Sequence, residues 1–337
     1  MRAMVLETPG PAESAPLRLE EVTLPTPRAG QIRLRVRCCA VCHTDLHIVE
    51  GELPLPRLPL VIGHQIVGVV EAAGAGVEQF KEGDRAGVPW LHWTCGQCDY
   101  CRQGRENLCQ NAQFTGYHVD GGYCEYAIVA ADFAYAIPEV FSDEHAAPLL
   151  CAGVIGYRAY RLSGIQRGQR LGLYGFGASA HLVLQLARYE GCEVYVFTRS
   201  PSHRELAATL GAAWCGAAED TPPQLLDSSI IFAPAGALVP QALRVLRRGG
   251  TLALAGITMS AIPQFEYSLL YYERTVRSVA NSTRRDCREF LALAAEIAAA
   301  RGAFQTEIQV FDLKEANQAV QALKRSQLRA AAVLQIG

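Results

Sequence analysis

Residues 169–200 read QRLGLYGFGASAHLVLQLARYEGCEVYVFTRS. A short apolar run is followed by a glycine-rich turn, an amphipathic segment and a second apolar run. This order predicts a strand, a turn, a helix and a strand, which is the βαβ unit of a doubly wound parallel sheet. Beyond it the pattern predicts helix, strand, helix and strand over 202–211, 228–236, 238–250 and 251–257. This part of the chain is therefore predicted to be an α/β domain.

The turn in this unit carries the residues of a dinucleotide-binding site. Gly175, Gly177 and Ala180 occupy the three positions of the pattern GxGxxG/A. The first permits a tight turn, the second lets the backbone approach a pyrophosphate, and the third lets helix pack on strand. The helix that follows offers free N–H groups to the phosphates. Many glycine turns bind nothing, but the position of this one between a predicted strand and a predicted helix favours a cofactor.

The residues after the second strand indicate which dinucleotide binds. NAD-binding units usually carry Asp or Glu there to bind the ribose hydroxyls, whereas this chain has Thr198, Arg199 and Ser200. Without the carboxylate a 2′-phosphate is not repelled, and a guanidinium can bind it. The sequence therefore predicts NADP(H) over NAD(H). The alternative is that Arg199 is a solvated surface residue in a site that distinguishes neither ribose.

The length and the net charge of the chain indicate the broad class of protein. The chain has 337 residues, half of them hydrophobic, which is enough for two domains. Its net charge is −2, without blocks of like charge, so no nucleic-acid or membrane surface is predicted. Glu7 and Pro9 interrupt the start before a signal peptide could form, and no apolar run could span a membrane. We expect a cytoplasmic protein whose 12 cysteines stay reduced.

Four cysteines predict a closed metal site. Cys95, Cys98, Cys101 and Cys109 stand in the order CxxCxxCx7C. Thiolates at this spacing can surround one zinc ion tetrahedrally and leave no open position, so the site is predicted to be structural. An iron–sulfur cluster is the alternative, but the proline that usually follows the last cysteine is missing and the fourth spacing differs. The length of the chain argues against a disulfide pair.

The chain up to about residue 150 is rich in glycine, proline and short alternating apolar runs, which predict strands joined by turns. Cys42, His64 and Cys151 are scattered through it. Each alone is more often a core residue than a ligand. Together, two thiols and one imidazole are a ligand set for a catalytic zinc, which keeps its fourth position for water or substrate.

The chain resembles the zinc-containing medium-chain alcohol dehydrogenases over nearly its whole length. The resemblance rests on the dinucleotide turn and on six further segments, CHTDLH (42–47), GHQIVG (63–68), GVPWLHWTCGQCDYC (87–101), FTGYHVDGGYCEY (114–126), PLLCAG (148–153) and RRGGTLALAGI (247–257). It implies a GroES-like, mostly β catalytic domain built from both chain ends, and a Rossmann domain inserted between them. The implied catalytic domain covers 1–151, with a structural zinc lobe at about 92–112, and 284–337; the Rossmann domain covers 152–283. The family also implies a homo-oligomer, either a dimer or a tetramer.

The resemblance implies roles for the metal ligands. It makes Cys42, His64 and Cys151 the ligands of a catalytic zinc, and the four clustered cysteines the ligands of a structural zinc. Asp45 would accept a hydrogen bond from His64 and fix the orientation of its ring.

Five further residues receive roles in the same way. Thr44 would contact the substrate oxygen, and His47 would form the outer end of a proton relay. Trp90 and Phe114 would line the substrate pocket, although either could equally be an ordinary core residue. Arg284 would lie near the cofactor phosphates, unless its neighbour Arg285 does so instead.

The implied reaction is reversible hydride transfer. Zinc lowers the pKa of a bound alcohol, an alkoxide forms, and hydride passes to the nicotinamide. We predict an alcohol dehydrogenase and aldehyde reductase for primary alcohols and aldehydes, with two zinc ions per subunit and NADP(H). A secondary-alcohol or polyol dehydrogenase of the same fold is one alternative. A non-catalytic zinc-binding or NADPH-binding protein is another, because fold does not fix function.

Three positions depart from the family pattern. Ala178 stands in the turn where glycine is common, which is expected to be tolerated because this residue opens the helix. Gln65 stands where the family has glutamate, so the shape is kept and a negative charge near the catalytic zinc is lost. The expected result is a slightly more positive field at the metal, and the alternative is a substitution without kinetic effect. Ile155 stands where many relatives have a threonine against the nicotinamide, so that contact is not transferred.

Overall fold

The computed structural model describes residues 1–304 and 306–337, which fall into two compact units. Unit 1 contains Met1–Ala152, Ser282–Ala295 and Thr306–Gly337, and unit 2 contains Gly153–Asn281 and Glu296–Gln305. Unit 1 therefore takes its residues from both ends of the chain, and each unit is described by itself below.

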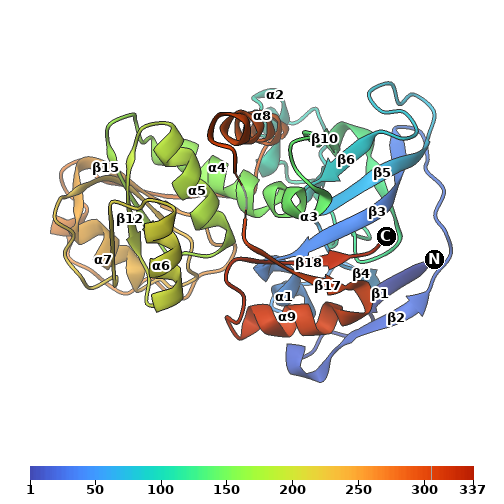
Figure 1. Ribbon diagram of the computed structural model, residues 1–337, viewed down its shortest axis with the longest axis horizontal. Helices are drawn as coiled ribbons and strands as arrows, with labels where there is room; N and C mark the ends of the chain where they lie inside the picture. The colour runs from blue at the N-terminus through green and yellow to red at the C-terminus, as the bar shows by residue number, and fades with distance from the viewer. Residues whose placement is uncertain (305) are drawn as a thin grey trace. The chain divides into compact units, whose positions relative to one another are not determined.

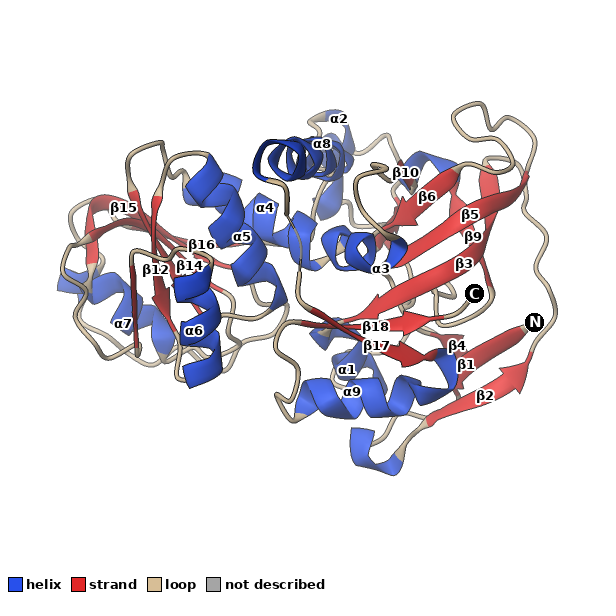
Figure 2. Ribbon diagram, viewed as in Figure 1, coloured by secondary structure: helices blue, strands red, loops and turns tan. Residues whose placement is uncertain are grey.

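Unit 1 is mostly β (Figure 2). Its largest sheet has seven strands in the order β10-β6-β5-β3-β18-β17, with β9 also paired to β3. The C-terminal strand β18 runs antiparallel to β3, with Ala332 opposite Val41, so the end of the chain completes a sheet begun near its start. The strands are β3 Gln31–Val41, β5 Ile66–Ala73, β6 Arg85–Val88, β9 Tyr126–Ala130, β10 Tyr135–Ala136, β17 Ile308–Asp312 and β18 Ala331–Gln335.

Two smaller sheets and several short helices complete unit 1. The order β2-β1-β4 forms a three-stranded sheet from Leu17–Glu21, Arg2–Leu6 and Leu60–Val61, and Leu91–Trp93 (β7) pairs with Gln113–Phe114 (β8). The α-helices are α1 His43–Val49, α2 Asp99–Arg102, α3 Asp143–Ala146 and α9 Ala316–Lys324, together with the part of α8 (Arg284–Arg301) up to residue 295, since its last turns belong to unit 2. Short 3-10 turns are η1 Ala12–Ser14, η2 Glu106–Leu108, η3 Ala131–Phe133, η4 Ala147–Leu150 and η6 Leu313–Glu315. Across the part of the chain that the structure describes, every helix is too short or too polar to cross a membrane.

Unit 2 is built on a six-stranded sheet in the order β13-β12-β11-β14-β15-β16, in which every neighbouring pair is parallel. Numbered along the chain, this is the order 3-2-1-4-5-6 of a Rossmann sheet. The predicted α/β, doubly wound class is confirmed. Figure 1 labels two strands of this sheet, β12 and β15, and the helices α5, α6 and α7 of the same unit. The strands are β11 Arg170–Tyr174, β12 Glu193–Phe197, β13 Trp214–Gly216, β14 Leu226–Ile231, β15 Leu246–Leu254 and β16 Thr275–Ser278, and the helices α4 Ala152–Ser163, α5 Ala178–Tyr189, α6 Pro201–Thr209, α7 Leu238–Arg244 and η5 Tyr267–Leu269.

Alternate side chains of the unit 2 strands enter two different cores. In β12, Val194 and Val196 pack with the apolar face of α5, whereas Tyr195 and Phe197 pack with that of α7. Successive side chains of a strand point to opposite faces, so both faces of this sheet are buried. The Phe197 ring stacks on Tyr174 of β11 at a centroid distance of 4.2 Å.

Two predicted elements are wrong in their second halves. The strand predicted over 228–236 ends at Ile231, the last residue of β14. The helix predicted over 238–250 ends at Arg244, and Leu246–Leu254 forms strand β15. Leu246 pairs with Leu226 of the neighbouring β14, and its side chain is fully buried in the core on the α7 face. Pairing with a neighbouring strand therefore overrides the helix predicted from the local pattern of residues 245–250 (VLRRGG).

Leu173 offers a test of this packing. Its side chain is fully buried on the central strand β11, so Leu173→Ala should lower the free energy of unfolding of unit 2 by about 2–5 kcal/mol. Leu225→Ala is the matched control because Leu225 is 51% exposed, and it should change stability by less than about 0.5 kcal/mol. Urea denaturation followed by circular dichroism measures both, and equal midpoints for the two variants would contradict this account.

Candidate functional site

The structure brings together Cys42, His64 and Cys151, which are far apart in the sequence. Cys42 follows strand β3, His64 lies between β4 and β5, and Cys151 follows η4. Their two sulfur atoms and one imidazole nitrogen all lie within 4.8 Å of one another, and Cys42 Sγ is 3.1 Å from His64 Nε2. Two thiols and one imidazole suit zinc and leave one tetrahedral position for another ligand, so this group could hold a catalytic metal ion.

Asp45 links two of these three residues. The backbone N–H of Cys42 donates to its Oδ2 at 2.9 Å, which caps the start of α1, and its Oδ1 lies 3.0 Å from Nδ1 of His64. The backbone N–H of Thr44 also donates to Cys42 Sγ at 3.3 Å. The first turn of α1 therefore positions the sulfur, and the carboxylate turns Nε2 of His64 toward it, as expected for a residue that supports a metal ligand.

The electrostatics of the cluster favour a thiolate. Burial raises the pKa of Cys42, but the hydrogen bond from Cys151 and the nearby His64 outweigh burial and hold this pKa well below its usual value. Burial lowers the pKa of His64, but Asp45 and Cys42 raise it further, to well above its usual value. A protonated imidazole thus compensates the negative charges of this buried group. A bound metal cation would supply the same compensation in place of the proton.

The loop that carries His64 is held by backbone contacts. Gly63, at φ +96°, lacks the Cβ that would stand 2.3 Å from a ring carbon of Tyr123. The N–H groups of Gly121, Gly122 and Tyr123 donate to the carbonyls of residues 61, 63 and 62 at 2.7, 2.9 and 3.0 Å. Sequence reasoning did not assign this supporting role to residues 121–123, and the adjacent glycines of DGGY were the available signal.

The other predicted active-site residues lie near this cluster or near one another. Trp90 stacks on Phe114 at a centroid distance of 4.3 Å, and the ring of His64 is 6.1 Å from Trp90. Thr44 is buried in the first turn of α1. His47, on the same helix, contacts the carboxylate of Glu52 through Nδ1. Sequence reasoning missed Glu52, although its position five residues after His47 is local.

The four clustered cysteines also converge. The Sγ atoms of Cys95 and Cys101 are 3.9 Å apart, those of Cys98 and Cys101 3.5 Å, and those of Cys95 and Cys109 3.6 Å. Four sulfurs around one zinc at tetrahedral geometry would be separated by about 3.8 Å, so the observed spacing fits that metal. Backbone N–H groups of the same loop lower the pKa of Cys95 to about 6, which favours its thiolate form.

Arg284 has partners within unit 1. Its backbone N–H and its Nε approach Oε1 of the buried Glu106 at 3.0 and 3.4 Å, and its guanidinium lies 5.0 Å from the centre of the Phe133 ring. Glu106 belongs to the segment between Cys101 and Cys109. Arg285 instead pairs with Glu289 one helical turn later. A contact of Arg284 with cofactor phosphates stays a prediction.

The glycine turn of unit 2 has room for a ligand. Gly175 has φ +82°, and a Cβ there would stand 3.0 Å from the backbone nitrogen of Ala233. A Cβ on Gly177, in contrast, would meet no described atom within 4 Å. Crowding within the protein therefore does not explain glycine at 177, whereas close approach of a pyrophosphate would explain it. Gly177 precedes α5, whose first N–H groups receive no side-chain cap, and Ala180 is fully buried on that helix.

The three residues after β12 differ in their surroundings. Thr198 is buried and donates its backbone N–H to Gly216 at 2.8 Å, and Ser200 caps helix α6 through its hydroxyl. Arg199 is exposed between them. Nε of Arg204 donates to the carbonyl of Thr198 at 2.9 Å and so fixes this segment.

Comparison with known proteins identifies two domain families in the chain. The model of the alcohol dehydrogenase GroES-like domain matches residues 28–139, and that of the zinc-binding dehydrogenase matches residues 180–296.

One curated relative and two solved structures agree with these two family matches. The chain is 44% identical to a Mycobacterium tuberculosis (strain CDC 1551) protein named "Probable alcohol dehydrogenase AdhA", over 100% of this chain and 97% of that one. Acetophenone reductase from Geotrichum candidum, solved with NAD, superposes with a TM-score of 0.88 at 25% identity, covering 99% of this chain and 96% of that one. A Sinorhizobium meliloti protein described as a "putative zinc-binding dehydrogenase", bound to NADP, superposes with a TM-score of 0.86 at 26% identity, covering 99% of this chain and 98% of that one.

Gly63 provides a test of the three-residue cluster formed by Cys42, His64 and Cys151. In Gly63→Ala the new Cβ would collide with Tyr123 and displace the loop that carries His64, so zinc affinity at the three-residue cluster should fall about tenfold or more. The measurement is zinc retained after dialysis against a graded chelator. Gly76→Ala is the control, because Gly76 also has a positive φ, +80°, but no described atom within 4 Å of its Cβ position. Equal zinc retention in the two variants would show that the close approach of Gly63 to Tyr123 does not affect zinc binding at this cluster.

Proposed function

Because the chain belongs to the zinc-containing medium-chain alcohol dehydrogenases, we propose that it interconverts primary alcohols and aldehydes by hydride transfer with NADP(H). The chain is an oxidoreductase. The observation that carries the proposal is the convergence of Cys42, His64 and Cys151, which leaves one position open for a substrate oxygen. In the proposal these three residues hold the catalytic zinc, the four clustered cysteines hold a structural zinc, and the protein acts as a homo-oligomer.

The reaction removes a hydride from the carbinol carbon and a proton from the hydroxyl group. Zinc, when bound, supplies a Lewis acid that makes this proton easier to remove. The chain's own residues guide the proton. Thr44 is buried beside Cys42 in the first turn of α1, and His47 lies one turn later. The carboxylate of Glu52 fixes the His47 ring through Nδ1, and we assign the pair Thr44 and His47 to proton transfer.

The stacked rings of Trp90 and Phe114 support the choice of substrate. They form an apolar wall, and the His64 ring is 6.1 Å from Trp90. Such a wall suits a small or medium apolar group on the carbinol carbon. One neighbour is named acetophenone reductase, which keeps ketones and secondary alcohols as the second candidate class. Initial rates over a panel of aldehydes, ketones, primary alcohols and polyols distinguish the two, and faster turnover of ketones would replace the first proposal.

The preference for NADP(H) rests on Arg199. This exposed guanidinium follows β12, and no carboxylate stands at the adjacent positions 198 and 200 to bind a ribose hydroxyl. A charge-assisted pair with the 2′-phosphate would favour NADPH, and with it aldehyde reduction. The relatives leave the choice open, since one neighbour was solved with NAD and another with NADP.

Arg199→Ala should raise the Michaelis constant for NADPH about tenfold and leave that for NADH nearly unchanged, because only NADPH carries the 2′-phosphate. Arg204→Ala serves as the control. Arg204 holds the backbone of the same segment through Thr198, so its loss should affect both cofactors alike. Wild-type efficiency that is equal with the two cofactors, or higher with NADH, would end the NADP(H) proposal.

Cys42→Ala should abolish turnover and remove one of two zinc ions per chain, because it deletes a ligand of the open cluster and leaves the cysteine lobe intact. Elemental analysis and initial rates measure both effects. Cys215→Ala, at a half-buried cysteine on β13, should keep both zinc ions and the activity. Full activity in Cys42→Ala would contradict the assignment of the catalytic metal.

A further inference from the structure

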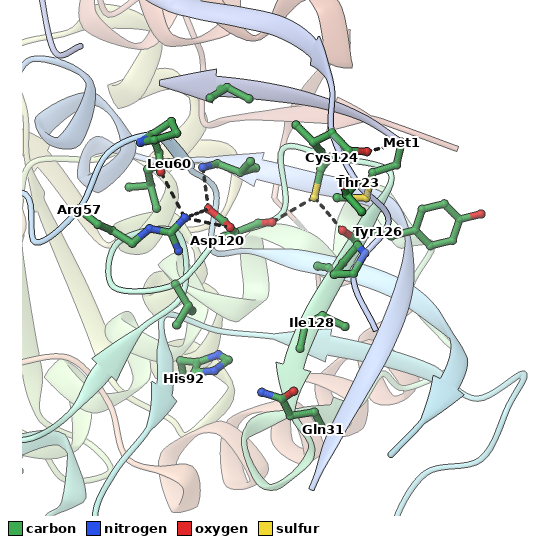
Figure 3. A pocket seen from close by; sticks show the side chains of 18 residues that line it. Met1, Thr23, Gln31, Arg57, Leu60, His92, Asp120, Cys124, Tyr126 and Ile128 are labelled. Atoms are coloured by element: carbon green, nitrogen blue, oxygen red, sulfur yellow. Dashed lines mark hydrogen bonds and ion pairs between the residues drawn. The ribbon is translucent and has the colours of Figure 1, made fainter. Parts of the chain in front are cut away.

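His92 and His181 are both buried, and each has one ring nitrogen without a hydrogen-bond partner among the described residues. A buried polar atom without a partner destabilises the fold, so each of these nitrogens needs an explanation. Figure 3 shows His92 in the wall of a hollow of unit 1, apart from the ion pair of Arg57 and Asp120. The surroundings of His181 in unit 2, in contrast, indicate what its ring does.

The ring of His181 is bonded to the glycine turn. His181 lies near the start of α5, and its Nδ1 is 3.1 Å from the carbonyl oxygen of Gly177. The backbone N–H of His181 donates to the same oxygen at 3.2 Å. A carbonyl oxygen has two lone pairs, so it can accept both bonds. One residue therefore holds this carbonyl twice.

This bond determines which ring nitrogen of His181 carries the proton. Burial lowers the pKa of His181 to about 4, so the ring is neutral at pH 7 and carries one proton. The oxygen of Gly177 can only accept, so the proton is on Nδ1. Nε2 is then an unprotonated acceptor, and it is the buried atom without a described partner. A leucine would fill a similar volume without this cost, so stability alone does not explain a histidine here.

The turn needs a restraint because glycine is flexible. Gly177 has no Cβ to limit its backbone and gives the start of α5 no side-chain cap. In a planar trans peptide the carbonyl and the N–H point in opposite directions. A carbonyl of Gly177 that is held toward the helix therefore directs the N–H of Ala178 outward, beyond the start of α5. N–H groups in the first turn have no partner within a helix, so this one is free to bind an anion.

From these contacts we propose that His181 is a positioning residue for the cofactor. Its Nδ1–H holds the peptide between Gly177 and Ala178, so that the Ala178 N–H is directed outward to receive the pyrophosphate. Because its ring is buried, His181 acts through Gly177 and not by contact with the cofactor. A turn that is already ordered loses less conformational freedom when a ligand binds, which strengthens binding. The inference rests on the proposed binding of a dinucleotide at this turn.

His181→Leu removes the side-chain donor and tests the proposal. The dissociation constants of NADPH and NADH should both rise about fivefold, because both cofactors carry the pyrophosphate. Fluorescence titration of the zinc-loaded chain measures these constants. Initial rates should show a similar rise in KM for both cofactors, with kcat nearly unchanged. The urea midpoint of unfolding should not fall below that of the wild type, because the unpartnered Nε2 is removed and Gly177 keeps its backbone bond.

Two further variants separate this role from general packing. The side-chain amide of asparagine carries its N–H groups as many bonds from the backbone as Nδ1 of histidine, so His181→Asn should bind both cofactors within about twofold of the wild type. Gln185→Leu is the matched control. Nε2 of Gln185 donates to the carbonyl of His181 at 3.1 Å, which is the same bond one helical turn further from the glycine turn. Its loss should leave both dissociation constants unchanged.

Three results would overturn the inference. They are wild-type affinity in His181→Leu, a loss of affinity that His181→Asn does not restore, and an equal loss in Gln185→Leu. A wild-type chain that binds neither NADPH nor NADH would instead contradict the proposed function of the turn, and the inference with it. Titration of the wild type therefore comes first and distinguishes the two failures.

Discussion

The positions of Cys42 and His64 in the candidate metal-binding cluster depend on the buried carboxylate of Asp45. One oxygen accepts the backbone N–H of Cys42, and the other meets Nδ1 of His64. A buried carboxylate is costly unless such partners satisfy it, so these contacts fix the junction of β3 and α1 against the loop after β4. As a result, Cys42 Sγ and His64 Nε2 stand 3.1 Å apart through the fold alone. The distance between these two candidate ligand atoms is thus set by hydrogen bonds within unit 1.

Glycine serves the metal cluster and the dinucleotide turn for opposite reasons. At Gly63 the missing Cβ makes room for Tyr123 of the same unit, and main-chain bonds then hold the loop before His64. At Gly177 the missing Cβ leaves space that no described atom fills, next to the uncapped start of α5. The first glycine allows the protein to pack against itself. The second leaves the backbone accessible to a phosphate group.

The sequence predicted the features that depend on local pattern. The βαβ unit around Gly175 was predicted correctly because its hydrophobic periods and its glycine turn lie within one continuous segment. The helix predicted over 238–250 was wrong because burial of Leu246 and its pairing with β14 decide that segment, and neither is visible locally. The contact of Tyr123 with Gly63 joins residues far apart in the sequence, so a local pattern could not predict it either. The roles of individual ligands came from the family resemblance, since spacing alone could not join Cys42 to Cys151.

Gln65 adds a charge argument to this picture. It directly follows His64 and is almost completely buried. With both thiols ionised, the cluster and Asp45 would place three negative charges around a cation of charge two. A glutamate at 65 would add a fourth in a region where burial already raises the pKa of Asp45. The amide keeps the size of the side chain without that repulsion, so a metal ion held by this cluster would lie in a less negative environment than it would in a Gln65→Glu variant.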